Sequence, residues 1–468
     1  MNNSLKIKEL LQNAEPQLTL DPLDPMKCAR ALVNASFTNN DATRTLHRYR
    51  GDFWRWSISH YRASTEEVVR SEIWQFLDKA FRADKEGRLL PFRPTRSIVA
   101  NVLDALSAVC QLDASIDPPA WLVDNKQPPA NEYVAVANGL LHLKTRELSP
   151  PTPTYFGVSA STVRYDPAAP EPRKWIAFLK EGLEDDTAIS LAQEWFGYSL
   201  APDTSQQKIL LCIGPKRAGK GTLARVLTSL VGRSSVSGPT MGSLATNFGL
   251  EPLIDKPLAI VSDARIGQRT DKSVIVERLL SISGEDTLTV DRKFKLAWSG
   301  RLPTRFVILT NEMPSLTDGS GALVGRFLVL LFKKSFYGKE NVGLTDELLD
   351  ELPSILNWAI EGYERLLSRG YFEQPKNAKE TIEAMEALGS PIKAFIAEEC
   401  IVGPTQEVEV DLLYTHYCTW CEKARLIPRS KQWFGRDLSS ALPGLKTRKP
   451  RSDDARKLVY VGIGEGPY

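Results

Sequence analysis

Cysteine and long apolar runs are both scarce in this 468-residue chain. Six cysteines are too few for a disulfide-stapled scaffold, so a reducing, cytoplasmic setting is the simplest expectation. No apolar run approaches the roughly 18 residues that span a bilayer. The first twenty residues also lack the long apolar stretch of a secretory signal. These absences argue against a secreted disulfide scaffold and against a membrane partner.

The composition is that of a globular protein with an uneven charge distribution. With 42% hydrophobic and 25% charged residues, the chain can bury a core, and its length suggests about three domains. The net charge is only +2. Residues 423–468, however, carry 11 Lys and Arg against 4 Asp and Glu, a balance of +7. A basic tail of this kind indicates an anionic partner, usually nucleic acid, although a merely solvated basic surface fits equally well.

Local patterns divide the chain into four predicted parts. Residues 1–45 form a lead segment, and residues 46–200 form a mixed α+β domain. Within that domain Asn138 and Gly139 separate two apolar runs, which predicts a hairpin. Ser64 and Glu67 have the spacing of a capping box ahead of a helix at 64–82. Residues 175–200 have the pattern of two helices at the end of this domain.

Residues 201–375 are predicted to form an α/β core. Short apolar runs at 209–213, 258–261, 306–309 and 327–331 alternate with helical patterns, as expected for a sheet covered on both faces. A helix at 345–367 closes this core. The remaining residues, 376–468, are predicted to contain a linker (371–390 by pattern) and a small module with helices at 392–399 and 412–424 and a strand at 458–461. That order is typical of a winged-helix domain.

The most informative motif follows the first of these strands and opens a helix at 223–230. It has the form of a P-loop, in which glycines let backbone N–H groups surround phosphate oxygens and a lysine reaches the β- and γ-phosphates. The sequence departs from the usual pattern at Gly221, which stands where a Ser or Thr hydroxyl normally binds Mg²⁺. The predicted nucleotide-binding residues are Gly214, Pro215, Lys216, Arg217, Ala218, Gly219, Lys220, Gly221 and Thr222.

Three further polar residues stand near strand ends in the order that an ATPase requires. Asp263 follows the second strand and is predicted, with Thr222, to hold Mg²⁺; no second acid stands beside it. Asn311 follows the third strand, where an amide can orient the attacking water. Arg326 precedes the fourth strand and is a candidate arginine finger. An ordinary cap, a turn residue and a surface arginine are the respective alternatives.

A basic cluster lies between Asp263 and Asn311 in the sequence. Residues 287–290 have a strand pattern, and the predicted hairpin tip that follows carries Arg292, Lys293 and Lys295. Such a tip can grip a sugar–phosphate backbone. So small a cluster is, by itself, more often just solvated.

The ordered set of motifs resembles the superfamily 3 helicases, and among them the phage and plasmid primase–helicases related to the poxvirus primase-helicase. Residues 138–148, 165–175 and 193–200 resemble the helicase-associated N-terminal domain of that group. Residues 390–392 and 414–421 resemble its C-terminal winged-helix module. The likeness covers roughly residues 46–468.

This resemblance implies an AAA+-like P-loop ATPase core that assembles as a hexameric ring around DNA and translocates 3′–5′ on single strands. It implies ATP and Mg²⁺ as cofactors and a winged helix that binds duplex DNA. By resemblance Lys220 takes the Walker A role, Asp263 the Walker B role, Asn311 the sensor role and Arg326 the finger role, while Lys293 and Lys295 lie on the DNA-contacting hairpin. The short lead segment leaves no room for a primase domain, so a separate primase or polymerase is an expected partner.

Two other functions remain open from the sequence. The Gly-Lys-Gly-Thr ending also occurs in small-molecule P-loop kinases, although a kinase leaves the basic tail unexplained. A replication initiator, in which ATP only orders a ring on DNA, uses the same motifs. Finally, Cys418 and Cys421 have the spacing of half a zinc site, but no second pair follows, and a place in the core is the preferred interpretation.

Overall fold

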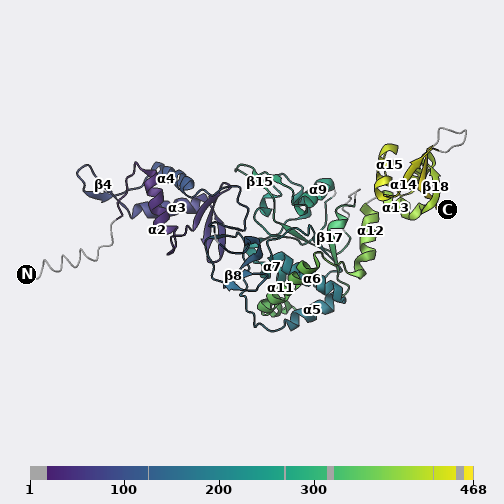
Figure 1. The fold of residues 1–468 in the computed structure, drawn as a ribbon, viewed down its shortest axis with the longest axis horizontal. Helices are drawn as coiled ribbons and strands as arrows, with labels where there is room; N and C mark the ends of the chain where they lie inside the picture. The colour runs from purple at the N-terminus through teal and green to yellow at the C-terminus, as the bar shows by residue number, and fades with distance from the viewer. Residues whose placement is uncertain are drawn as a thin grey trace, which may run out of the picture. The chain divides into compact units, whose positions relative to one another are not determined.

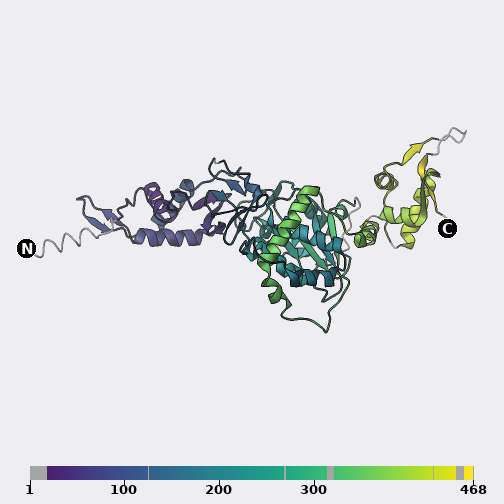
Figure 2. The ribbon, with the colours of Figure 1, turned by 60° about the horizontal axis from the view of Figure 1, so that its bottom comes forward.

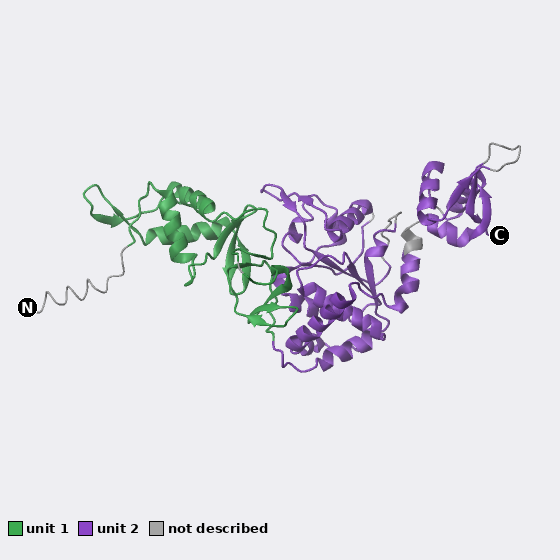
Figure 3. Cartoon of the chain, viewed as in Figure 1, with its two compact units in different colours: residues 1–165 green, residues 166–468 purple. Residues whose placement is uncertain are grey.

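A computed structural model of the chain describes residues 18–124, 126–267, 270–313, 321–389, 391–424, 426–449 and 458–466. The chain divides into two compact units, residues 1–165 and 166–468 (Figure 3). This division differs from the predicted boundary at residue 200, because the two helices that precede it pack within the second unit. Residues 1–17 of the predicted lead segment, and residues 425, 450–457 and 467–468 of the basic tail, lie outside the described residues.

The first unit combines helices with small antiparallel sheets (Figure 1). Its core joins α2, α3 and α4 to the β1-β2-β3 sheet through buried aliphatic and aromatic side chains such as Leu32, Ile73 and Leu106. Helix α2 lies inside the predicted lead segment, so that segment contributes to a folded core. The elements are α2 (Pro25–Ser36), β1 (Leu46–Tyr49), β2 (Asp52–Ser57), β3 (His60–Ser64), α3 (Glu66–Asp78), β4 (Phe81–Ala83), β5 (Leu89–Pro91) and α4 (Arg96–Val109).

The predicted capping box is wrong. Ser64 ends strand β3, and the N-cap of α3 is Thr65, whose side chain makes no capping hydrogen bond. Pairing of Ser64 with Phe53 across the sheet competes with the cap and prevails. The helix also ends at Asp78 rather than near residue 82, because residues 81–83 pair with β5.

The predicted hairpin at Asn138 and Gly139 is confirmed. Strand β7 (Tyr133–Val136) pairs antiparallel with β8 (Gly139–His142), and β8 pairs with β9 (Leu148–Ser149). The Asn138 side chain donates to the Tyr165 carbonyl and accepts from the Tyr165 amide, so the turn is tied to the end of the unit. The rest of this part contains β6 (Ala120–Trp121), η1 (Ala130–Glu132) and β10 (Tyr155–Phe156).

A five-stranded, all-parallel sheet organises the second unit. Its order is β12-β13-β16-β11-β17, which confirms the predicted α/β class. The four predicted strands are all present; the edge strand β12 was not predicted. The strands are β11 (Ile209–Ile213), β12 (Val236–Ser237), β13 (Leu258–Val261), β16 (Arg305–Thr310) and β17 (Phe327–Leu331).

Both faces of this sheet are covered, as the apolar runs predict. Alternate strand residues such as Leu211, Val261 and Ile308 join one buried cluster with α8 (Met241–Leu244), α9 (Lys272–Ser283) and the hairpin of β14 (Leu288–Val290) and β15 (Trp298–Gly300). The opposite face carries α7 (Lys220–Val231) and α6 (Asp186–Leu200). In Figure 1 these two groups of elements lie on either side of the strands.

Helices α5 (Arg173–Leu183) and α11 (Leu352–Arg369) pack against α6. Figure 2 shows the green α11 running in front of the α/β core. Gly362 of α11 permits close packing, since an added Cβ would collide with the backbone of Gln193 on α6. The carboxylate of Glu194, 1% exposed, is bound by Arg365 and Arg369 of α11. A buried ion pair therefore joins the helix before the P-loop to the one that closes the core.

Two predictions, the single helix at 345–367 and the linker at 371–390, are corrected by the structure. The single predicted helix at 345–367 is two helices, α10 (Leu344–Leu349) and α11, because Pro353 lies in the first turn of α11 and starts a new helix there. The predicted linker contains η5 (Lys376–Ala378) and α12 (Lys379–Gly389). Ala378 and Met385 lie in the core cluster of the parallel sheet, so the α/β core extends past its predicted end at residue 375.

The C-terminal part has its own core of aromatic side chains, including Phe395, Tyr417 and Phe434. The predicted helices and terminal strand are present; α15 and β18 were not predicted. Cys421 is buried in this core, which agrees with the preferred interpretation of the cysteine pair. The elements are α13 (Pro391–Glu399), β18 (Cys400–Glu409), α14 (Val410–Lys423), α15 (Lys431–Ala441), β19 (Lys446–Arg448) and β20 (Val459–Glu465), with sheet order β18-β20-β19.

Candidate functional site

The predicted P-loop joins the end of β11 to the start of α7. Gly219, the N-cap of α7, has φ of +96°, a conformation that favours glycine. A Cβ on Gly219 would lie 2.9 Å from Phe178 of α5, and one on Gly214 would collide with the carbonyl oxygen of Phe332. Both glycines are therefore required by the packing of the loop, whose backbone encircles the N-terminus of α7.

Lys220 is the central charged group of this loop. Its side chain is buried, and its Nζ donates to the carbonyl oxygens of Gly214 (2.5 Å) and Pro215 (2.7 Å) and to Oδ1 of Asn311 (3.2 Å). Burial lowers the pKa of the Lys220 ammonium from its ordinary value. A partly desolvated cation gains more from an anionic ligand than an exposed one. The contact brings together two of the predicted site residues, Lys220 at the start of α7 and Asn311 directly after β16.

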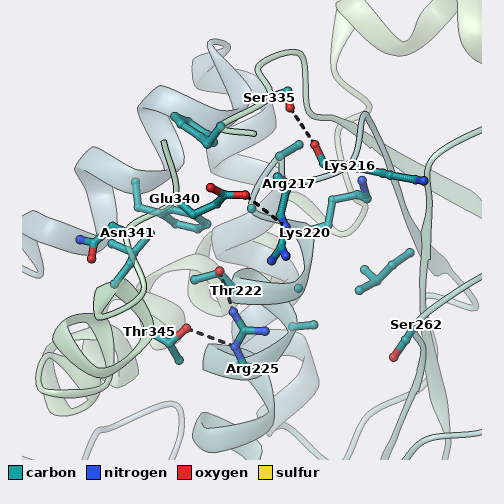
Figure 4. Close-up of a pocket in the computed structure, with 18 of the residues that line it drawn as sticks. Lys216, Arg217, Lys220, Thr222, Arg225, Ser262, Ser335, Glu340, Asn341 and Thr345 are labelled. Carbon is teal, nitrogen blue, oxygen red and sulfur yellow. Dashed lines mark hydrogen bonds and ion pairs between the residues drawn. The ribbon is translucent and has the colours of Figure 1, made fainter. Parts of the chain in front are cut away.

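The P-loop opens into a cavity of about 1550 Å³ (Figure 4). Ala218, Gly219, Lys220, Gly221 and Thr222 are among the residues that line it. Its lining is strongly cationic, with seven Lys and Arg against two Glu, and an anion as large as a nucleoside triphosphate fits both its size and its charge. The charged lining residues are Lys216, Arg217, Lys220, Arg225, Arg233, Lys334, Lys339, Glu181 and Glu340.

A strap that follows β17, residues 332–345, borders the cavity and binds the P-loop backbone. Ser335 Oγ donates to the Lys216 carbonyl at 2.8 Å, and the Phe336 amide donates to the Arg217 carbonyl at 3.0 Å. Arg217 forms an ion pair with Glu340 at 3.4 Å. Figure 4 shows these strap side chains on one side of the loop, with Ser262 on the other. The sequence carried no motif for this strap, so it was not predicted.

The predicted acid does not line this cavity. Ile260 and Ser262 do, whereas Asp263, two residues beyond the end of β13, is not among the lining residues. Its carboxylate accepts from the Arg265 amide at 3.2 Å and lies 3.3 Å from Arg265 Nε. Among the residues with described placement, no group of three or more His, Cys, Asp or Glu is arranged to hold a metal ion.

Thr222, the other predicted Mg²⁺ ligand, lines the cavity, but its hydroxyl accepts a hydrogen bond from Arg225 Nη2 at 3.0 Å. The hydrogen-bond donors at the loop, including the Arg225 guanidinium, thus suit phosphate oxygens better than a bare divalent cation. A Mg²⁺ ion that enters with a nucleotide would be held chiefly through phosphate and water.

Arg326 lies at the opposite edge of the sheet from the P-loop. It immediately precedes β17, whereas the P-loop follows β11, and these strands are parallel neighbours. Its Nη1 donates to Gln207 Oε1 at 3.1 Å, so the half-buried guanidinium is anchored next to the start of β11. The site residues Lys220 and Asn311 are therefore assembled without Arg326 within this chain.

The predicted basic hairpin is present. Strands β14 (Leu288–Val290) and β15 (Trp298–Gly300) pair antiparallel. At the tip Phe294 is 95% and Leu296 86% exposed, and Lys293 Nζ lies 5.2 Å from the Phe294 ring centroid. Arg292 Nε donates to the Leu296 carbonyl at 3.0 Å and so shapes the tip. The tip presents basic and apolar groups together, and the apolar pair was not singled out in the sequence.

Comparisons with known proteins match both units. Residues 30–183 match a family described as D5 N terminal like. Residues 212–326, which include the P-loop, Asn311 and Arg326, match a family of unknown function, DUF5906. The first match begins at α2 and ends with α5, so it spans the boundary between the two compact units.

Two solved structures share the fold. The A form apo structure of the NrS-1 C terminal region is 12% identical, with a TM-score of 0.51, over 94% of this chain and 100% of that one. Another apo structure of the same region gives 12% identity and a TM-score of 0.50, over 94% and 99%. At this identity the likeness concerns the fold alone.

Proposed function

We propose that this protein is an ATP-hydrolysing, ring-forming DNA helicase that acts in the replication of a phage, plasmid or other mobile element. The observation that carries the proposal is the contact between Lys220 and Asn311 at the carboxyl edge of the parallel sheet, inside a large cationic cavity. Ligands of open α/β sheets bind at this edge. Lysine and amide there can contact the terminal phosphate and its attacking water, respectively.

The chain's own groups supply most of what triphosphate binding needs. Backbone amides of the loop and the N-terminus of α7 offer fixed partial positive charge, and Lys220 adds a full charge. ATP and Mg²⁺ are the proposed cofactors. Thr222 and Asp263 remain the proposed partners of the metal. Thr222 would contact it through water, because Arg225 holds its hydroxyl. Asp263, now paired with Arg265, would reach it after a side-chain rotation.

Single-stranded DNA is the proposed track. Lys293 and Lys295 stand on a hairpin tip whose exposed Phe294 can stack on a base, and such tips combine phosphate attraction with stacking. The C-terminal module, with its basic α15 and flanking segments, is the proposed contact to duplex DNA as a winged helix. A separate primase or polymerase is a proposed further partner.

The ring is proposed from the position of Arg326. A guanidinium at the far edge of the sheet cannot serve the P-loop of its own chain, but in a head-to-tail ring it can reach the nucleotide of the next subunit. A hexamer is the expected ring size.

The test is ATP hydrolysis by the full chain with and without single-stranded DNA, together with strand displacement on a tailed duplex. We expect DNA-stimulated hydrolysis and displacement that Lys220→Ala abolishes. Stimulated hydrolysis without displacement would instead indicate an initiator ring. Phosphoryl transfer to a small molecule, insensitive to DNA, would indicate a kinase and overturn the proposal.

A further inference from the structure

Next to Gly221, where the usual P-loop pattern has a hydroxyl, lies the guanidinium of Arg225. Gly221 carries no side chain, and a Cβ built there would first meet Nη1 of Arg225, 3.4 Å away. Residues 221 and 225 are one turn apart on α7, so their side chains share a face of the helix. A serine or threonine at 221 would compete with Arg225 for this space.

Arg225 is held in this position by two hydroxyl groups. Its Nη2 donates to Thr222 Oγ1 at 3.0 Å, and its Nε donates to Thr345 Oγ1 on α10 at 3.2 Å (Figure 4). The side chain is exposed to the cavity and lines it beside Lys220 and Thr222. These bonds use Nε and Nη2, and a planar guanidinium has five N–H donors, so donors remain to face the cavity.

We propose that Arg225 is a phosphate-binding residue that replaces the metal-liganding hydroxyl of the P-loop. Its ligand class is the di- or triphosphate of a nucleotide bound on Lys220, so the inference rests on the proposed function. A guanidinium binds phosphate oxygens through paired, charge-assisted hydrogen bonds. Because this charge is part of the protein, nucleotide binding depends less on a divalent cation than in P-loops where a hydroxyl and Mg²⁺ share the task.

A purely structural role for Arg225 makes a different prediction. If the guanidinium only ties α7 to α10, its loss weakens nucleotide binding equally with and without metal. If it binds phosphate, the loss is largest when no metal neutralises the phosphates. The ratio of the dissociation constants in EDTA and in Mg²⁺ therefore separates the two roles.

The experiment measures ADP binding to the full chain by calorimetry, in excess Mg²⁺ and in EDTA. We expect wild type to bind in both, with dissociation constants within about tenfold of each other. Arg225→Gln should weaken binding about tenfold or more in EDTA, and clearly less in Mg²⁺, while Arg225→Lys retains part of the metal-free affinity. Lys174→Gln is the control, because it removes an ion pair of 3.1 Å between α5 and α10 outside the cavity and should leave the ratio unchanged.

The outcomes separate this inference from the proposed function. If wild type binds ADP and Arg225→Gln has the wild-type ratio, the inference is overturned while nucleotide binding stands. If wild type binds no nucleotide in either condition, both fail. Thermal unfolding of each variant checks that it is folded. If Arg225→Gln does not fold, Arg225→Lys supplies the test. Wild-type affinities and a wild-type ratio in Arg225→Lys would contradict phosphate binding by a bidentate guanidinium.

Discussion

At the scale of single residues, the site depends on how the P-loop backbone holds Lys220. The ammonium is directed by two loop carbonyls and Asn311, and the loop is itself packed through Gly214 and Gly219 against Phe332 and Phe178. In the proposed function, preorganisation of this kind places a charge at the phosphate site without reorganisation at the moment of reaction.

Lys220→Ala should therefore abolish ATP turnover, by about a hundredfold or more, because a charge contact to the reacting phosphate is lost. Steady-state phosphate release measures it. The variant should melt near the wild-type temperature, since Lys220 makes no ion pair within the described part of the chain. Hydrolysis at the wild-type rate would remove Lys220 from the mechanism.

Arg326→Ala should still bind ATP and assemble, yet hydrolyse about a thousandfold more slowly, because a finger stabilises charge that develops only in the transition state. Mixing Arg326→Ala with Lys220→Ala should partly restore hydrolysis, since some interfaces then pair an intact loop with an intact finger. Activity proportional to concentration down to the monomer would contradict action in trans.

Arg301 is the alternative candidate for the finger. Arg305 is a poor candidate, because its buried guanidinium donates to carbonyl oxygens of its own chain.

At the scale of elements, the β14–β15 hairpin has the features of a binding element, whereas the α6–α11 pair stabilises the core. The hairpin exposes its apolar and basic tip to solvent, which costs stability and is typical of a binding element. The helix pair buries the Glu194 carboxylate between the helix that precedes the P-loop and the helix that closes the core.

Replacing Lys293 and Lys295 together with Ala should weaken single-stranded DNA binding and reduce its salt dependence by roughly 1.4 in log–log slope, for two phosphate contacts. Hydrolysis without DNA should be unchanged. The matched control replaces Lys376 and Lys379, two exposed lysines away from the hairpin, and should bind normally. Equal binding by both double variants would show that the hairpin charges are only solvated.

Glu194→Ala should lower the free energy of unfolding by about 3 kcal/mol, because Arg365 and Arg369 then lose the carboxylate that pairs them at a buried position. Denaturant titration of the full chain measures the loss. Glu373→Ala, which removes only a 3.8 Å exposed contact to Arg369, is the control and should cost less than about 1 kcal/mol. A loss of that small size for Glu194→Ala would show that the buried pair contributes little.

At the scale of the whole molecule, the chain is built of two compact units, and no helix in the described ranges is long and apolar enough to cross a bilayer. The first unit contains buried histidines. Burial lowers the pKa of His47 and of His60 to about 4, with smaller effects of Arg44 and Arg62. Neither ring nitrogen of His47 has a hydrogen-bond partner among the described residues.

Stability should consequently fall on acidification. Unfolded histidine binds a proton near pH 6.5, whereas the folded rings stay neutral to about pH 4, so the full stability is present above pH 6.5 and is lost as the pH falls toward 4. Unfolding midpoints between pH 7.5 and 4.5 measure this. His47→Leu, which fits among the Tyr61 and Phe156 rings, should show a weaker pH dependence. An unchanged slope in that variant would exclude His47 as a source.

Features that depend on contacts between residues close in sequence were predictable, and features that depend on tertiary contacts were not. Strands buried on both faces, the Asn138 turn and the strand–loop–helix around Lys220 arise from local patterns, and all are present as predicted. The capping box at Ser64, the single helix at 345–367 and the linker at 371–390 were wrong, because strand pairing, Pro353 and packing of Met385 on the sheet outweighed local preference.

The sequence alone determined the α/β class, the position of the P-loop and the contents of its strands, since hydrophobic period and glycine placement act over a few residues. Only the tertiary structure decided which polar groups meet. It placed Asn311 on Lys220, turned Ser262 rather than Asp263 toward the cavity, set Arg326 at the far edge and tied Arg225 to Thr345 of α10. These juxtapositions follow from strand order and from the packing of helices on the sheet, which join residues up to 120 positions apart, and no local pattern encodes them.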